Sequence, residues 1–178
     1  FEPLSLAQIA ARASETGGPI NGRASANTTG ADGGFGTHIC DVEVDRETGR
    51  VLVKRYTVIQ DVGRAIHPAY VEGQMQGGAV QGIGWALNEE YLYDRGGRLE
   101  NPGFLDYRMP VASDLPMIDC VIIEVPNSKH PQGVRGCGEV PIVPALAAVA
   151  NALGRALGQR FHELPMRPSN VLAAVEGK

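Results

Sequence analysis

The sequence predicts an α+β fold, in which β-hairpins and helices are mixed along the chain. Apolar residues recur with a period of two in some segments and with helical spacing in others. The two kinds of segment do not alternate regularly, which argues against a doubly wound sheet. The chain has 178 residues, 43% of them apolar, so it is long enough to bury a core of its own.

The first part of the chain is predicted to form a helix and then a hairpin. Residues 5–14 carry apolar side chains at helical spacing after Ser5, which can serve as the N-cap. A polar, glycine-rich loop covers residues 15–35. Alternating apolar residues predict strands over 37–44 and 51–58 around the turn DRETG, and a change of phase in the second strand predicts a β-bulge.

A long helix is predicted over residues 70–90, although this stretch contains five glycines. A glycine inside a helix costs about 1 kcal/mol relative to alanine, so the helix is expected to touch something closely. The remaining elements are predicted to be a hairpin around 94–97, a strand at 118–125, a loop at 126–138, a helix at about 141–157 and a short helix from Ser169.

Composition and charge exclude several classes of protein. The chain has 16 lysines and arginines against 20 acidic residues, a net charge of −4, whereas nucleic-acid-binding proteins show a basic face or stripe. No apolar run approaches the roughly 20 residues of a membrane span. Cys40, Cys120 and Cys137 are far apart and odd in number, so the sequence encodes no disulfide framework, and a reducing, cytoplasmic location is expected.

Glu139 is the first candidate for a catalytic residue. It follows a glycine-rich loop and directly precedes the helix predicted at 141–157. A helix N-terminus favours the ionised carboxylate, and a positioned carboxylate is what a general base requires. The alternative is that Glu139 only complements the helix terminus, and the local sequence by itself favours this simpler interpretation.

The glycine-rich helix is the second candidate site. Gln74, Gln76 and Gln81 offer amide donors and acceptors that suit a heterocyclic or oxo-bearing cofactor, and small neighbours allow close approach. The alternative is tight packing between helices with the glutamines in solvent, and the residues alone do not decide between the two. The histidines are scattered without the spacing of metal ligands, so no metal-ligating residue is predicted.

Three segments carry the most specific motifs of the sequence, in this order: FGTHICDVEVDRETGRVLVKRY, DVGRAIHPAYVEGQMQGGAVQGIGWAL and GVRGCGEVPIVPALAAVANAL. Together they resemble the C-terminal portion of the molybdopterin-binding large subunit of the xanthine dehydrogenase and aldehyde oxidase family, the molybdenum hydroxylases. The resemblance implies that residues 1–178 are the C-terminal part of a molybdopterin-binding domain. Residues 1–35 would lead into a motif-bearing core at 36–164, and a tail helix would occupy 165–178.

The resemblance implies roles for individual residues. The family's Gly-x-Gly-Glu motif matches residues 136–139, so Glu139 would be the base that deprotonates the hydroxide bound to molybdenum. The family's glutamine within its glycine-rich helix matches Gln81, which would contact the pyranopterin. The glycines that would let the cofactor approach are Gly77, Gly78, Gly82 and Gly138.

The resemblance also implies an activity. The enzyme would oxidise an aldehyde or an aromatic N-heterocycle, such as a purine-like or nicotinate-like ring, with water as the oxygen source. Its cofactor would be a molybdenum pyranopterin, expected as the cytosine dinucleotide, while iron–sulfur clusters and FAD are expected on partner domains or subunits. Other motifs of the family are absent from these 178 residues, so the chain would need the remainder of the molybdopterin-binding subunit and would be inactive alone. The alternative is a non-catalytic scaffold or assembly domain that does not itself bind cofactor.

Overall fold

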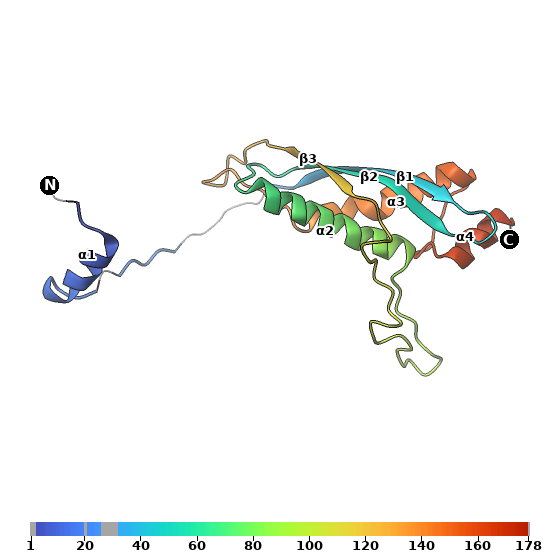
Figure 1. Cartoon of the computed structure of the whole chain (residues 1–178), viewed down its shortest axis with the longest axis horizontal. Coiled ribbons are helices and arrows are strands. Elements are labelled where there is room, and N and C mark those ends of the chain that lie inside the picture. The colour runs from blue at the N-terminus through green and yellow to red at the C-terminus, as the bar shows by residue number, and fades with distance from the viewer. Residues whose placement is uncertain (1–2, 20, 26–31, 178) are drawn as a thin grey trace. The chain divides into compact units, whose positions relative to one another are not determined.

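The structure, a computed structural model, describes residues 3–19, 21–25 and 32–177 and divides into two units, residues 1–31 and 32–178 (Figure 1). The predicted loop at 15–35 lies partly outside the described residues.

The first unit contains α1 (Leu6–Arg12), followed by one turn of 3-10 helix, η1 (Ala13–Glu15). Ser5 is the N-cap of α1, as predicted. The Ser5 hydroxyl accepts a hydrogen bond from the backbone N–H of Gln8 at 3.3 Å, and the Gln8 side chain accepts one from the Ser5 N–H at 2.8 Å. This reciprocal capping box satisfies two N–H groups that a helix start otherwise leaves without partners.

The second unit is built on a mixed three-stranded sheet with strand order β1–β2–β3. The strands are β1 (Phe35–Val44), β2 (Val51–Asp61) and β3 (Ile118–Ile123). β1 pairs antiparallel with β2, which forms the predicted hairpin, and β2 pairs parallel with β3. The α+β class predicted from the sequence is confirmed.

The predicted bulge lies at Lys54. Asp41 pairs with Arg55 and Val42 with Val53, so Lys54 has no partner of its own. Lys54 and Arg55 are both exposed in succession, while the residues on either side of them are buried. The extra residue therefore lets both halves of β2 direct their apolar side chains to the same face, which explains the change of phase in the sequence.

Two helices cover one face of the sheet, and they are α2 (Pro68–Leu87) and α3 (Val143–Leu157), the latter preceded by a 3-10 turn, η2 (Val140–Ile142) (Figure 1). A last short helix, α4 (Pro168–Val175), follows as predicted. The core joins the sheet to these helices and includes Tyr56, Val58, Met75, Ala79, Ile83, Ala145, Val149, Leu153 and Val171. On the opposite face of the sheet, Phe35, Ile39, Val121 and Ile123 are exposed.

Two elements are shorter than predicted. The strand at 118–125 ends at Ile123, because the N–H of Val125 donates to the side chain of Asp61 instead of to a neighbouring strand. The hairpin around 94–97 is reduced to one isolated bridge between Tyr93 and Leu99. Its residues are almost all exposed, so no apolar face stabilises longer strands there.

The segment Val140–Leu157 is long and apolar enough, by length and composition alone, to cross a membrane. In this structure one side of the helix is part of the core, because Ala145, Val149 and Leu153 are buried against the sheet and α2. A core helix of this kind passes the same test of length and hydropathy.

Candidate functional site

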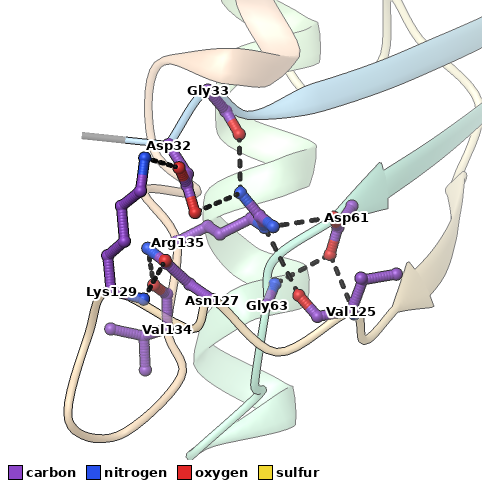
Figure 2. A network of polar contacts seen from close by, with 9 residues as sticks. All are labelled: Asp32, Gly33, Asp61, Gly63, Val125, Asn127, Lys129, Val134 and Arg135. Carbon is purple, nitrogen blue, oxygen red and sulfur yellow. Dashed lines mark hydrogen bonds and ion pairs between the residues drawn. The ribbon is translucent and has the colours of Figure 1, made fainter. Parts of the chain in front are cut away.

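The loop that leads to Glu139 is attached to the end of β2 (Figure 2). Asp61 is the last residue of β2, and one of its carboxylate oxygens accepts hydrogen bonds from the N–H groups of Gly63 at 2.9 Å and Val125 at 3.1 Å. The other oxygen lies 3.1 Å from Nε of Arg135. The two side chains are 11% and 10% exposed, so the ion pair is largely shielded from water.

Arg135 also contacts two other segments (Figure 2). One terminal nitrogen of its guanidinium donates to the carbonyl of Gly33 at 3.0 Å, and Nε lies 3.4 Å from the carbonyl of Val125. The same terminal nitrogen lies 3.9 Å from Asp32, whose other oxygen pairs with Lys129 at 2.8 Å. The hydrogen bond from Lys129 lowers the pKa of the Asp32 carboxyl.

The loop is held at neighbouring positions as well. The N–H of Arg135 donates to the carbonyl of Val62 at 2.8 Å. The side chain of Gln60, which is 1% exposed, donates to the carbonyl of Cys137 at 3.4 Å. Gly63 adopts a positive φ of 73°, and a side chain there would collide with the carbonyl of Gly133. The four consecutive residues 60–63, at and just after the end of β2, thus contact the loop as far as Cys137, which lies two residues before Glu139.

Glu139 itself is exposed and precedes η2 as its N-cap residue. Its side chain makes no capping hydrogen bond, and no ion pair joins it to any other residue that the structure describes. Glu139 therefore does not act as a hydrogen-bonding cap, whereas the simpler interpretation, in which its charge complements the helix terminus, needs no such bond. The carboxylate is left open to solvent at the end of a firmly held loop.

The glycines of α2 divide between two faces of the helix. Gly78, Gly82 and Gly84 are buried, and a Cβ at Gly84 would lie 2.8 Å from Pro110. A Cβ at Gly78 would lie 2.6 Å from Pro141, and one at Gly82 would collide with Ala145. These two glycines therefore serve close packing against η2 and α3, as the packing alternative predicted. Gly77 is exposed, and a Cβ there would meet no atom within 4 Å.

The three glutamines of α2 have different surroundings. Gln76 donates to the carbonyl of Ile118 at 3.3 Å and so ties α2 to β3. Gln74 lies beside the glycine-rich loop, because a Cβ at Gly138 would lie 3.0 Å from its side-chain oxygen. Gln81 is exposed on the side of α2 that also carries Gly77. The structure thus brings α2 against Gly138 and leaves the Gln81 amide and the Glu139 carboxylate accessible.

A cavity of about 220 Å³ lies between the first turns of α2 and the loop before Glu139. Its lining includes Gln74, Arg135 and Cys137, together with Tyr70, whose ring stacks on His67 with centroids 4.0 Å apart. A larger cavity of about 630 Å³, near the start of β2 and α4, is lined by none of the predicted site residues.

Sequence reasoning missed the pairing of Asp61 with Arg135. By its local surroundings Asp61 would only stabilise its own turn, and the hydrogen bond from the N–H of Gly63 shows that it does this as well. The available signal was an acidic and a basic residue in two of the three motifs, DVGR and GVRG. Within the described ranges, no group of three or more histidine, cysteine, aspartate or glutamate residues could hold a metal ion.

Comparison with known proteins places these features in a family. The family model of the molybdopterin cofactor-binding domain matches residues 2–116, which include α2 and stop before the loop that leads to Glu139. The xanthine dehydrogenase molybdenum-binding subunit of Escherichia coli O157:H7 is 37% identical over 175 residues, which are 96% of this chain and 23% of that protein.

Two further proteins show the same relationship. The nicotine 6-hydroxylase large subunit of Paenarthrobacter nicotinovorans is 41% identical over 145 residues, 80% of this chain and 18% of that protein. The solved structure of the aldehyde oxidoreductase of Desulfovibrio gigas superposes with a TM-score of 0.74 at 31% identity, over 80% of this chain and 15% of that one. The chain therefore spans less than a quarter of the length of each of these relatives.

Proposed function

The chain belongs to the molybdopterin cofactor-binding domain family, and from this premise we propose that it forms part of the catalytic subunit of a molybdenum hydroxylase. In this proposal the assembled enzyme oxidises an aldehyde or an aromatic N-heterocycle with water as the oxygen source, and Glu139 is its general base. The observation that carries the proposal is the exposed carboxylate of Glu139, which pairs with none of the described residues and directly follows Gly138, the loop residue that lies against α2.

The residues present fit a pyranopterin. Gly77 leaves open space along the outer face of α2, and no atom lies within 4 Å of a Cβ built at Gly136. The exposed amide of Gln81 offers both a donor and an acceptor, as a heterocycle with ring nitrogens and oxo groups requires. Contacts from Gln81, Gly77 and Gly138 are therefore proposed. Gly78 and Gly82, also predicted to let the cofactor approach, face η2 and α3 and would act only by shaping the helix.

As the general base, Glu139 would accept, at a carboxylate oxygen, the proton that is removed from the oxygen source. When bound, the molybdenum cofactor supplies the redox chemistry, and the protein contributes position and proton transfer. An exposed glutamate without an ion-pair partner has both oxygens free to accept. A base must also be held within hydrogen-bond reach of its proton, and the contacts of Gln60 and Arg135 fix the chain close to Glu139.

The names of the relatives support the proposed substrate class. One is named for xanthine, a second for nicotine and a third for aldehydes. The first two substrates are N-heterocycles, and the third reacts at a carbonyl carbon, which agrees with the aldehyde or purine-like or nicotinate-like ring proposed here.

The form of the cofactor, the partner subunits and the cellular location are also proposed. The cofactor is proposed to be molybdopterin cytosine dinucleotide. Iron–sulfur clusters and FAD are assigned to partner domains or subunits, and the remainder of the molybdopterin-binding subunit would complete the site. The isolated chain would be inactive, and a cytoplasmic location agrees with its three free cysteines.

The alternative is a scaffold or assembly domain that does not itself bind cofactor. One observation favours it: packing within the chain, against η2 and α3 at Gly78 and Gly82 and against Pro110 at Gly84, explains three of the five helix glycines without any ligand. The two functions differ in cofactor content, because a scaffold purified with its partners would contain no pterin held by these residues.

The test is Glu139→Gln in the assembled enzyme. The amide keeps the shape of the side chain but cannot act as a base, so turnover should fall by at least about a hundredfold, while molybdenum and pterin content stay unchanged. The matched control is Glu163→Gln at another exposed glutamate, which should leave turnover as in the wild type. Wild-type turnover in the Glu139 variant would refute the proposed role of Glu139.

A further inference from the structure

We propose that the ion pair between Asp61 and Arg135 is a positioning device that fixes the loop carrying Glu139 against the ends of all three strands. This inference rests on the proposed role of Glu139. In it Asp61 and Arg135 act through the loop, and neither touches the substrate or the cofactor.

Arg135 joins segments that are far apart in the sequence. Its guanidinium contacts Asp61 at the end of β2, the carbonyl of Val125 beyond β3, and the carbonyl of Gly33 just before β1 (Figure 2). The planar fork of an arginine can hold several acceptors at fixed angles, which the single ammonium of a lysine cannot do. The position of Arg135 is therefore set by residues at or next to the ends of all three strands.

The loop transmits this position to Glu139. Only Gly136, Cys137 and Gly138 separate Arg135 from Glu139. The middle one of these three is held by Gln60, and Gly138 lies beside Gln74 of α2. Two glycines would otherwise give this short segment wide conformational freedom. The ion pair of Arg135 and the contacts of Cys137 and Gly138 are therefore needed to define the position of Glu139.

A role in stability alone does not explain the pair. Removing two charges from water has a large desolvation cost, so a buried ion pair often adds little to the free energy of folding compared with apolar side chains. The same pair gives strong directional constraint, since the Asp61 carboxylate is itself oriented by the N–H groups of Gly63 and Val125. Orientation is what this arrangement supplies and what a general base needs.

The test uses Asp61→Asn in the assembled enzyme. The amide oxygen of asparagine can still accept from Gly63 and Val125, while its NH₂ group would face the donor Nε of Arg135. The substitution therefore removes the ion pair with the Arg135 side chain, while the turn and the backbone contacts of the loop remain. The matched control is Asp41→Asn, which breaks the exposed pair of Asp41 with Arg55 on the same sheet.

Three measurements are made on each variant: kcat and KM, molybdenum content, and hydrogen exchange of the peptide covering residues 126–138. For Asp61→Asn we expect kcat to fall by about a hundredfold, since a displacement of about 1 Å can have this effect. KM and molybdenum content should stay close to wild type, and the peptide should exchange faster. Arg135→Lys, which keeps the charge but loses the fork, should show the same pattern more weakly. Asp41→Asn should change none of these quantities.

Several outcomes would overturn the inference. Wild-type kcat in Asp61→Asn, or unchanged exchange at 126–138, would show that the pair does not hold the loop. A loss of molybdenum in proportion to the loss of kcat would assign the pair to folding or assembly instead. Wild-type turnover in Glu139→Gln would refute the proposed function instead, and the exchange measurement would still decide whether Asp61 and Arg135 fix the loop.

Discussion

On the side of α2 that meets η2 and α3, Gly78 and Gly82 are buried, whereas Gly77 on the other side is exposed with open space around it. The packed side explains its glycines by contact within this chain. The open side, around Gly77 and Gln81, has no such explanation, because glycine lowers helix stability without any packing in return. Only towards the end of α2 does packing resume on this side, where a Cβ at Gly84 would lie 2.8 Å from Pro110. The difference shows that a glycine-rich helix can combine two independent constraints, and only the open side points to a ligand.

The largest effect that separates the two sides is expected for Gly82→Ala. The new methyl group would collide with Ala145 and lie 2.9 Å from the carbonyl oxygen of Ile142. Overpacking of this kind should reduce the free energy of unfolding by about 1–3 kcal/mol, measured by urea denaturation. A variant as stable as the wild type would show that α2 and α3 can separate freely, which would break the comparison.

The next largest effect is expected when the collision between Gly82→Ala and Ala145 is removed by a second substitution. Replacing Ala145 by glycine in the Gly82→Ala background removes the atom that the new methyl group meets, although the Ile142 oxygen remains near. Urea denaturation of the double variant should recover part of the lost free energy, despite the cost of about 1 kcal/mol for a glycine inside α3. Additive losses from the two substitutions would contradict the contact between the helices.

Gly77→Ala should have the opposite sign. No atom lies within 4 Å of the new Cβ, so the gain in helix propensity should raise the free energy of unfolding by about 0.5–1 kcal/mol. In the assembled enzyme the same methyl group would occupy the proposed cofactor surface, so molybdenum content should decrease. Greater stability with unchanged molybdenum content would remove Gly77 from the proposed site.

An effect that appears only at acidic pH concerns the packed side of the sheet, where burial lowers the pKa of His38 from 6.5 to about 4. In the unfolded chain this imidazole binds a proton at its ordinary pKa, so between about pH 6.5 and 4 the unfolded state holds more protons. Stability should therefore fall as the pH falls through this window. His38→Gln should have a smaller decrease in Tm between pH 7 and 4.5, and the exposed His162 serves as the control position. Equal decreases in both variants would contradict the burial of His38.

Periodicity predicted most elements because each strand or helix that packs on the core repeats its apolar residues in the sequence. It located the hairpin, α2, α3 and even the bulge, where the phase of β2 changes. It could not predict the pair of Asp61 and Arg135, because a contact between distant residues leaves no periodic trace. Nor could it assign the helix glycines to faces, since the packing of η2 against Gly78 depends on tertiary structure.

Glu139 and Gln81 were predicted as site residues because the motifs resemble those of the molybdenum hydroxylases. The local sequence alone favoured a helix-terminus role for Glu139. What the structure adds is the set of contacts that hold the loop at Arg135 and Cys137. These contacts depend on the end of β2, which lies in a different motif from the loop.

The bulge at Lys54 has a consequence for variation in chain length. Because Asp41 pairs with Arg55 and Val42 with Val53, deleting Lys54 would join two already paired positions into a regular ladder. No other side chain of the hairpin would change faces, and the exposed ion pair of Lys54 with Glu43 contributes little. At this position the gene could lose a codon and the encoded hairpin would keep its register.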